Sequence, residues 1–237
     1  MSSKTVSVII PSYNEEQNVR QAITTAAQVL EKNTDDYEIL AFNDGSRDKT
    51  GAILEELAKS NPHIKVIHNS PNKGYGFITR EGFRLATKEY ISWFSGDNSV
   101  EGESFARIIK SIGEADIVVA YMENAQVRSF MRSAVTGSYT ILMNVLFGLH
   151  IKYYNGPSVY PVKVVRQVKI AGNQYDLFAE LLIRSIKMGH SYKEVPFKHK
   201  ADNDGKSKAF SWRNALSTMK MFCVLINDIY FRRQPAG

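Results

Sequence analysis

The chain has 237 residues, 43% of them hydrophobic, which is enough to bury a substantial core and argues against strong disorder. Lys and Arg outnumber Asp and Glu by 30 to 24, so the charge favours anionic partners such as nucleotides, lipid phosphates or anionic membranes. The single cysteine, Cys223, excludes an intrachain disulfide, and the lack of a dense basic helix or an aromatic RNA-binding signature argues against a nucleic-acid partner.

The first half of the sequence alternates between apolar, strand-like runs and segments of helical periodicity. We predict strands at residues 6–10, 37–42, 64–68, 90–94 and 117–120, and helices at residues 14–30, 48–58, 75–86 and 105–112. Glu15 and Glu16 would lie in the first turn of the first helix, where they suit the positive end of the helix dipole. This alternation predicts an α/β fold with a Rossmann-like, mostly parallel sheet flanked by helices.

The second half of the sequence is less regular. We predict one or two helices at 129–149 that partly cover a cleft, a short strand at 159–162, a helix at 177–188 and a strand that ends at 194–196. After the polar stretch 200–208, residues 212–231 predict a C-terminal amphipathic helix, packed on the core or at a dimer contact, or else lying against an anionic membrane. We expect one domain over residues 1–210, with halves 1–122 and 123–210, and a C-terminal helix and tail over 211–237.

The ends and apolar runs of the chain bear on its location. Met1 leads directly into the first predicted strand and leaves no room for a charged leader, an apolar core and a cleavage site. No run approaches the roughly 18 uninterrupted apolar residues that a membrane span needs. We therefore expect a cytoplasmic protein, with peripheral membrane contact as an alternative.

Two polar segments directly follow the first two predicted strands, at residues 11–16 (P-S-Y-N-E-E) and 43–48 (N-D-G-S-R-D). Because parallel strands end at the same edge of a sheet, these segments should emerge side by side where open α/β sheets bind ligands. Carboxylates there can accept from ribose hydroxyls and base N–H groups, and backbone N–H groups at helix starts can face phosphate. The pattern predicts a nucleotide site.

Five motifs together resemble a known enzyme family. They are V-I-I-P-S-Y-N-E-E at 8–16, N-D-G-S-R-D-K-T at 43–50, N-K-G-Y-G at 72–76, an aspartate after a strand at 97, and E-V-P at 194–196 followed by G-K-S-K at 205–208. Over about residues 5–210 the chain resembles family 2 glycosyltransferases of the GT-A fold, and it is most similar to polyprenyl-phosphate and dolichyl-phosphate sugar synthases. The resemblance implies inverting transfer of a hexose from a nucleotide-diphosphate sugar to a polyprenyl phosphate or other lipid-linked acceptor.

The resemblance also assigns donor residues. It implies that the nucleoside is held by Pro11, Tyr13, Glu15 and Asp44, with Asp44 at the base or ribose. Lys73 and Gly74 match a loop beside the nucleotide, where glycine lets the backbone approach closely.

A metal site follows from the same resemblance. Asp97 matches the last carboxylate of an Asp-x-Asp motif, which binds a divalent Mg²⁺ or Mn²⁺ that bridges the diphosphate, so Asp97 is expected to be both catalytic and metal-binding. The first aspartate of that motif is replaced by Ser95, which removes a charged ligand. Metal use is therefore in doubt, and Lys73, Lys198, Lys200 and Lys206 are cations that could supply charge expected at the diphosphate and the acceptor.

The acceptor chemistry decides which other residues are needed. A phosphate acceptor is already ionised and needs positive charge more than a general base, and the candidate clamps are Arg128, Arg132, Lys206 and Lys208. Arg132 matches an arginine that meets the lipid phosphate in the resembling enzymes. A hydroxyl acceptor would need a catalytic carboxylate, either Asp176 or Glu180, although Glu180 could simply pair with Arg184 one helical turn on.

Three classes of function stay open at this point. The first is transfer to a polyprenyl phosphate, reached at the membrane surface or presented by a membrane partner protein. The second is a family 2 enzyme that acts on a hydroxyl of a glycan or glycolipid. The third is a non-catalytic subunit that binds a nucleotide sugar or regulates a partner, suggested by Ser95 and Asp202, which replace charged residues usual in the resembling enzymes.

Overall fold

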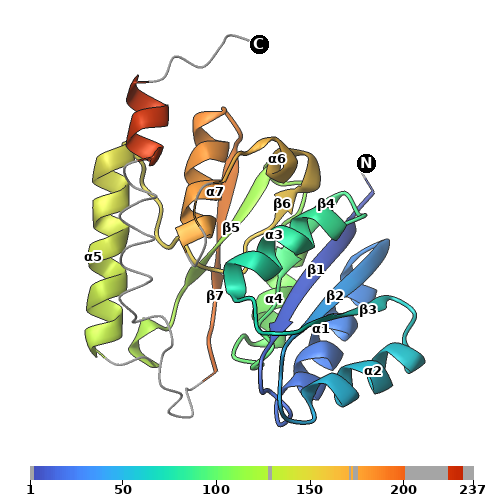
Figure 1. Ribbon diagram of the computed structural model, residues 1–237. Coiled ribbons are helices and arrows are strands. Elements are labelled where there is room, and N and C mark those ends of the chain that lie inside the picture. Colours follow the sequence, from blue (N-terminus) through green and yellow to red (C-terminus); the bar gives the residue numbers. More distant parts are fainter. Residues whose placement is uncertain (1–2, 128–129, 171, 173–175, 201–223, 232–237) are drawn as a thin grey trace.

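A computed structural model of the chain describes residues 3–127, 130–170, 172, 176–200 and 224–231 (Figure 1). Its centre is a five-stranded sheet of order β3-β2-β1-β4-β6. The strands β1 (Thr5–Ser12), β2 (Asp36–Asp44), β3 (Ile64–Asn69) and β4 (Tyr90–Trp93) are parallel, and only the short β6 (Tyr160–Pro161) runs antiparallel. The predicted mostly parallel sheet is therefore confirmed.

The central strand is buried on both faces, which explains its continuous apolar run. Val6, Val8 and Ile10 pack in a cluster with α1 (Val19–Asn33), α2 (Thr50–Ser60) and α4 (Gly102–Lys110). Ile9 points to the opposite face and packs in a second cluster with α3 (Tyr75–Leu85). The sheet is thus sandwiched between helices, as the alternating pattern predicts (Figure 1).

The later part of the chain adds a second, two-stranded parallel sheet of β5 (Ile117–Met122) and β7 (Tyr192–Phe197). An antiparallel bridge between Val118 and Val159 joins it to the segment that leads into β6. The remaining helices are α5 (Phe130–Phe147), α6 (Val162–Gln167) and α7 (Asp176–Lys187). The helix α7 is almost wholly buried, whereas α5 stands at one side of the molecule, away from the five-stranded sheet (Figure 1).

Two expectations about elements need correction. The first helix begins at Val19 rather than Asn14, because Asn14 adopts a left-handed backbone conformation with φ of 56° and residues 14–18 form a turn. Glu15 and Glu16 therefore do not lie in the first turn of α1. The expected strand at 159–162 is cut short at Pro161 by α6, a helix that the sequence pattern did not predict, whereas residues 130–147 form one helix, within the expectation of one or two.

The predicted C-terminal helix at 212–231 falls mostly outside the described residues. Its described part, residues 224–231, includes the π-helical segment Asn227–Phe231. Asp228 in this segment accepts a 2.9 Å hydrogen bond from the guanidinium of Arg184 on α7, and the Tyr230 hydroxyl donates to the carbonyl of Leu146 at the end of α5. No helix in the described part of the chain combines the length and the apolar character needed to span a bilayer.

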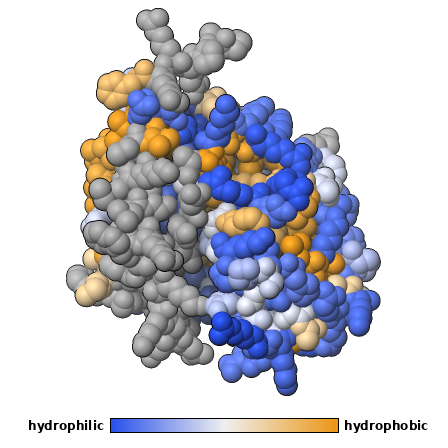
Figure 2. Space-filling view, viewed as in Figure 1, coloured by the Kyte–Doolittle hydropathy of each residue, from blue (hydrophilic) through white to orange (hydrophobic). Residues whose placement is uncertain are grey.

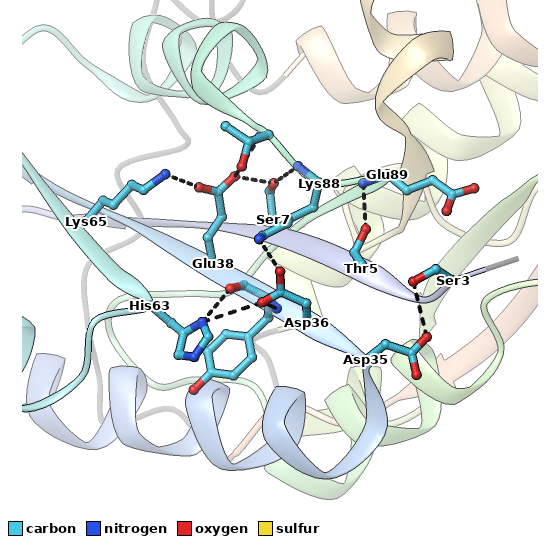
Figure 3. Close-up of polar contacts among 12 residues, drawn as sticks. Ser3, Thr5, Ser7, Asp35, Asp36, Glu38, His63, Lys65, Lys88 and Glu89 are labelled. Atoms are coloured by element: carbon cyan, nitrogen blue, oxygen red, sulfur yellow. Dashed lines mark hydrogen bonds and ion pairs between the residues drawn. The ribbon is translucent and has the colours of Figure 1, made fainter.

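A polar cluster closes the amino-terminal edge of the sheet (Figure 3). Glu38 is 2% exposed, and its carboxylate accepts hydrogen bonds from Ser7, Thr87 and Lys65 at 2.6–2.8 Å. Burial alone would raise the pKa of Glu38, but these hydrogen bonds outweigh it and hold the pKa below its ordinary value. The charged edge of Figure 3 therefore anchors β1 and β2 at the end opposite to the predicted ligand site.

Candidate functional site

The two polar segments after β1 and β2 are joined to each other by hydrogen bonds. The backbone N–H of Asn14 donates to Ser46 Oγ at 3.0 Å, and Asn14 Oδ1 accepts from the N–H of Arg47 at 2.9 Å. The N–H of Glu15 donates to Thr50 Oγ1 at 2.8 Å. The prediction that these segments emerge side by side at the carboxyl edge is confirmed.

The glutamates of the first segment serve this junction. Glu16 Oε2 accepts from the backbone N–H of Lys49, the residue that precedes α2, at 3.0 Å. The Glu16 N–H in turn donates to Asp48. The carboxylate of Glu15 accepts from the side chain of Asn18 at 3.0 Å. Glu16 thus stabilises the start of the second helix rather than the first, which corrects the helix-dipole interpretation.

Asp44 ends β2 and is 3% exposed. Its Oδ1 accepts from the Asn69 side chain at 2.8 Å and from the backbone N–H of Lys73 at 2.9 Å. Its Oδ2 accepts from the backbone N–H of Gly74 at 2.9 Å. The structure therefore brings Asp44, Lys73 and Gly74 together, and the carboxylate of Asp44 shapes the loop before α3.

Gly74 is needed for this loop because its φ is 86°, a conformation that residues with a Cβ rarely adopt. The next residue begins α3, so the loop presents the start of that helix at the carboxyl edge. Lys73 projects its ammonium over the ring of Phe77, 4.5 Å from the ring centroid. A positive side chain and a helix start thus lie beside Asp44, as a phosphate-bearing ligand requires.

The loop after β4 carries Asp97 and lies against the end of β1. A Cβ on Gly96 would overlap the carbonyl oxygen of Pro11, and it would come within 2.5 Å of Ser12 Oγ. Since β2 and β4 flank β1, Asp44 and the Asp97 loop follow the two strands on either side of it. Asp44 and Asp97 therefore share one edge of the sheet.

The residues around Asp97 do not fit a divalent ion held by protein ligands alone. Asp97 Oδ1 accepts from Ser95 Oγ at 2.5 Å and from the Ser99 N–H at 2.9 Å. The serine that stands in place of the expected first aspartate therefore uses one oxygen of the Asp97 carboxylate. Among the described residues, no three His, Cys, Asp or Glu side chains converge on one point. Hard cations prefer several oxygen ligands, and this loop offers one carboxylate.

A cation from another element lies beside Asp97 instead. The segment after β7 contacts the chain that follows Asp97, through an isolated bridge between Val100 and His199 and a 2.8 Å bond from the Lys200 N–H to the Ser99 carbonyl. Burial lowers the pKa of Lys200, while the negative charges of Glu101 and Asp97 act in the opposite direction. The sequence named Lys200 only as one of four cations, because nothing local indicates its pairing with residues a hundred positions earlier.

The two candidate bases are buried near the start of α7. Glu180 is fully buried, with Oε2 accepting from the Gly172 N–H at 2.7 Å and Oε1 from Arg184 at 2.8 Å. Asp176 is 4% exposed. The expected pairing of Glu180 with Arg184 is therefore present, together with a backbone partner that spacing could not predict.

Arg80 links this region to the donor loop, and sequence analysis missed it. It lies on α3, and its guanidinium donates to the carbonyls of Ile170, at 2.9 Å, and Gly172. Gly172 is thereby held through its carbonyl by Arg80 and through its N–H by Glu180. The helix that starts at the Asp44 loop is thus bonded directly to the segment that precedes α7.

Most of the residues expected to bind the acceptor phosphate lie outside the described part of the chain. Arg128, Lys206 and Lys208 lie outside the described residues, and Arg132 lies on α5. A surface hollow of about 590 Å³ is found at the opposite, amino-terminal edge, where Lys88, Tyr90, Asp116, Lys163 and Arg166 line it. We place the site at the carboxyl edge nonetheless, because the turns, glycines and carboxylates of all the early motifs meet there.

Comparison with known proteins decides the family. The model of glycosyl transferase family 2 matches residues 7–167, which is more than half of the chain and includes the loops of Asn14, Ser46, Asp44, Gly74 and Asp97. The chain belongs to glycosyltransferase family 2.

Relatives of this family 2 chain include two proteins of Bacillus subtilis. The uncharacterized glycosyltransferase EpsJ is 34% identical over 115 residues, which are 48% of this chain and 32% of EpsJ. The uncharacterized glycosyltransferase YkcC is 24% identical over 151 residues, which are 63% of this chain and 47% of YkcC. This chain thus matches a third to a half of the length of these curated relatives.

Solved structures show the same fold. Glucosyl-3-phosphoglycerate synthase from Mycobacterium tuberculosis in complex with UDP aligns with a TM-score of 0.68 at 15% identity, over 98% of this chain and 83% of that one. The same enzyme with Mn²⁺, UDP-glucose and phosphoglyceric acid aligns with a TM-score of 0.70 at 13% identity, over 98% and 82%. The expected GT-A-like fold of this family 2 chain is confirmed.

Proposed function

We propose that this chain transfers a hexose from a nucleotide-diphosphate sugar to a polyprenyl phosphate by direct displacement with inversion. The observation that carries the proposal is the convergence of three loops at one sheet edge. These are the joined segments after β1 and β2, the Lys73–Gly74 loop held by Asp44, and the Asp97 loop packed on Pro11. Such an edge can hold a nucleoside on one side and its diphosphate on the other.

UDP is the nucleotide to test first. The structural neighbour with the same fold binds UDP and, in another crystal, UDP-glucose. Base choice in this chain depends on the surroundings of Asp44, which already uses both carboxylate oxygens in the loop. GDP and GDP-sugars therefore belong in the same binding panel.

A phosphate acceptor agrees better with the described carboxylates than a hydroxyl does. A hydroxyl must lose a proton to a base within hydrogen-bonding reach. Glu180 is fully buried and bonded to Gly172 and Arg184, and Asp176 is 4% exposed. A phosphate monoester is largely ionised near neutral pH and needs no such base, so burial of both groups supports the phosphate.

An apolar face on α5 supports a lipid-linked acceptor. Ile141, Val145 and Phe231 are 66%, 75% and 77% exposed, and Met131 and Leu142 lie exposed on the same helix as the first two. Figure 2 shows apolar surface over the end of α5, beside the helical segment that contains Phe231. Exposed side chains of this kind can enter a lipid interface, and the net charge of +6 favours an anionic one.

A matched pair of acceptors tests the reaction. Purified protein is incubated with UDP- or GDP-sugars and with either a polyprenyl phosphate or the corresponding polyprenol in detergent, and the products are identified by mass spectrometry. We expect transfer to the phosphate and none to the alcohol. Asp97→Ala should abolish turnover, whereas the exposed Asp35→Ala at the opposite edge should not.

The other two functions correspond to other results. Transfer to the polyprenol or to a glycan hydroxyl, with none to the phosphate, would replace the proposal by a hydroxyl-directed enzyme. Nucleotide-sugar binding without turnover on either acceptor would favour a non-catalytic subunit. If no nucleotide raised the melting temperature of the protein, the proposal of a donor site would itself be rejected.

A further inference from the structure

We propose that Lys200 binds the diphosphate of the donor and supplies positive charge that a divalent ion supplies where a complete Asp-x-Asp motif is present. The inference rests on the proposed function and concerns how its donor site neutralises the negative charge of the diphosphate. Ser95 has removed one ligand of the metal motif, and Lys200 is the cation that the fold brings to the same loop.

The backbone around Lys200 is fixed on both sides. On one side the Lys200 N–H bonds to the Ser99 carbonyl at 2.8 Å, and the Glu101 N–H bonds to the Lys198 carbonyl at 3.2 Å. On the other side, Asn124 bonds to the backbone of His199 through both its amide oxygen and its amide nitrogen, at 3.0 and 2.8 Å. Lys200 therefore directly follows a residue whose backbone is paired with Val100 and bonded to the Asn124 side chain.

The link from Lys200 to Asp97 is short. Ser99 donates its N–H to Asp97 Oδ1 at 2.9 Å and accepts the Lys200 N–H at its carbonyl, so one residue connects the two. Within the described part of the chain, the Lys200 ammonium makes no ion pair of 4 Å or less. It is therefore available to an anionic ligand beside Asp97.

For electrostatic reasons, Lys200 and a divalent metal ion are alternatives to each other at this site. A fixed ammonium repels a divalent cation bound nearby, and Asp97 is one carboxylate whose Oδ1 already accepts two hydrogen bonds. The departing nucleoside diphosphate is strongly anionic, and a fixed cation stabilises that charge as the glycosidic bond breaks. The sugar–phosphate bonding pair leaves with the diphosphate, so Lys200 needs to donate hydrogen bonds and not a proton.

The test compares binding of UDP and uridine by calorimetry, each in EDTA and in Mn²⁺. We expect the wild-type protein to bind UDP in EDTA. Lys200→Met should lower the affinity for UDP at least tenfold while leaving the affinity for uridine unchanged. If Lys200 had only a structural role, Lys200→Met would lower the affinity for both UDP and uridine. Lys163→Met, at the opposite edge, makes the same change in net charge and should alter neither affinity.

A second variant reverses the substitution. Ser95→Asp combined with Lys200→Met should restore UDP affinity in Mn²⁺ and not in EDTA, because the pair of carboxylates is rebuilt and the repelling ammonium is gone. Equal UDP affinity of wild type and Lys200→Met in EDTA would overturn the role of Lys200 and leave the donor site standing. If the wild type bound no nucleotide under any condition, the proposed function would fall first.

Discussion

Oδ2 of Asp44 accepts the backbone N–H of Gly74 at 2.9 Å, which fixes the start of α3 to the end of β2. Oδ1 of the same carboxylate holds Lys73 and Asn69. The resemblance to family 2 enzymes implied that Asp44 touches the base or ribose. Its observed work is to shape the loop, and direct contact with a nucleoside stays a prediction.

Asp44→Asn should loosen this loop. An asparagine keeps the shape but has one acceptor oxygen, so its amide would face the N–H of Lys73 or Gly74 and leave a backbone donor without a partner. We expect a loss of about 1–3 kcal/mol in the free energy of unfolding and faster hydrogen exchange at Lys73 and Gly74. Asp35→Asn is the control, since Asp35 bonds only to the exposed Ser3–Lys4 segment and to no loop of the site.

Gly96→Ala should move the Asp97 loop away from β1. The added Cβ would meet the carbonyl of Pro11, which belongs to a central strand and has little room to shift. Donor binding should fall more than tenfold, with a loss of stability of about 1–3 kcal/mol. Gly137→Ala on α5 adds the same methyl group in open space, and it should raise stability by up to about 1 kcal/mol. Full donor affinity in Gly96→Ala would place the donor elsewhere.

Arg80→Met should separate donor binding from turnover. It removes the two bonds to the carbonyls of Ile170 and Gly172 while leaving the Asp44 loop intact. We expect UDP affinity within about threefold of wild type and kcat at least tenfold lower, because the segment before α7 loses its attachment to α3. Arg84→Met is a matched control on the same helix, where Arg84 pairs only with Glu81 at the surface. Equal loss of kcat in both variants would contradict a specific role for Arg80.

Glu38 should make stability depend on pH in the acid range. The pKa of this buried carboxyl is held below its ordinary 4.5 by Lys65, Ser7 and Thr87 against the effect of burial. A lowered pKa contributes stability above the unfolded value, and that contribution is lost as the pH falls from about 4.5 through the folded value. Denaturation of Glu38→Gln should therefore show a loss of about 1–3 kcal/mol at pH 7 that shrinks towards pH 3. Glu56→Gln, at an exposed ion pair with Arg20, should show a much smaller effect because solvent screens that pair.

The sequence predicted what depends on local pattern and on strand order. Alternating apolar runs indicated the parallel sheet, and that sheet alone requires the segments of Asn14 and Ser46 to meet. The start of α1 was misplaced because Asn14 bonds to Arg47 across the junction, a partner that no helical periodicity reveals. Arg80 and Lys200 depend on pairings with residues about ninety and one hundred positions away, which single-sequence patterns do not encode.

The hydrogen bonds between the turns after β1 and β2 have a consequence for engineering base preference. Asn14 needs Ser46 and Arg47, Glu15 needs Thr50, and Glu16 needs Lys49 and Asp48. Replacing one turn removes hydrogen-bond partners of the other, so we expect grafting from a homologue to succeed only if both are transplanted as a single cassette.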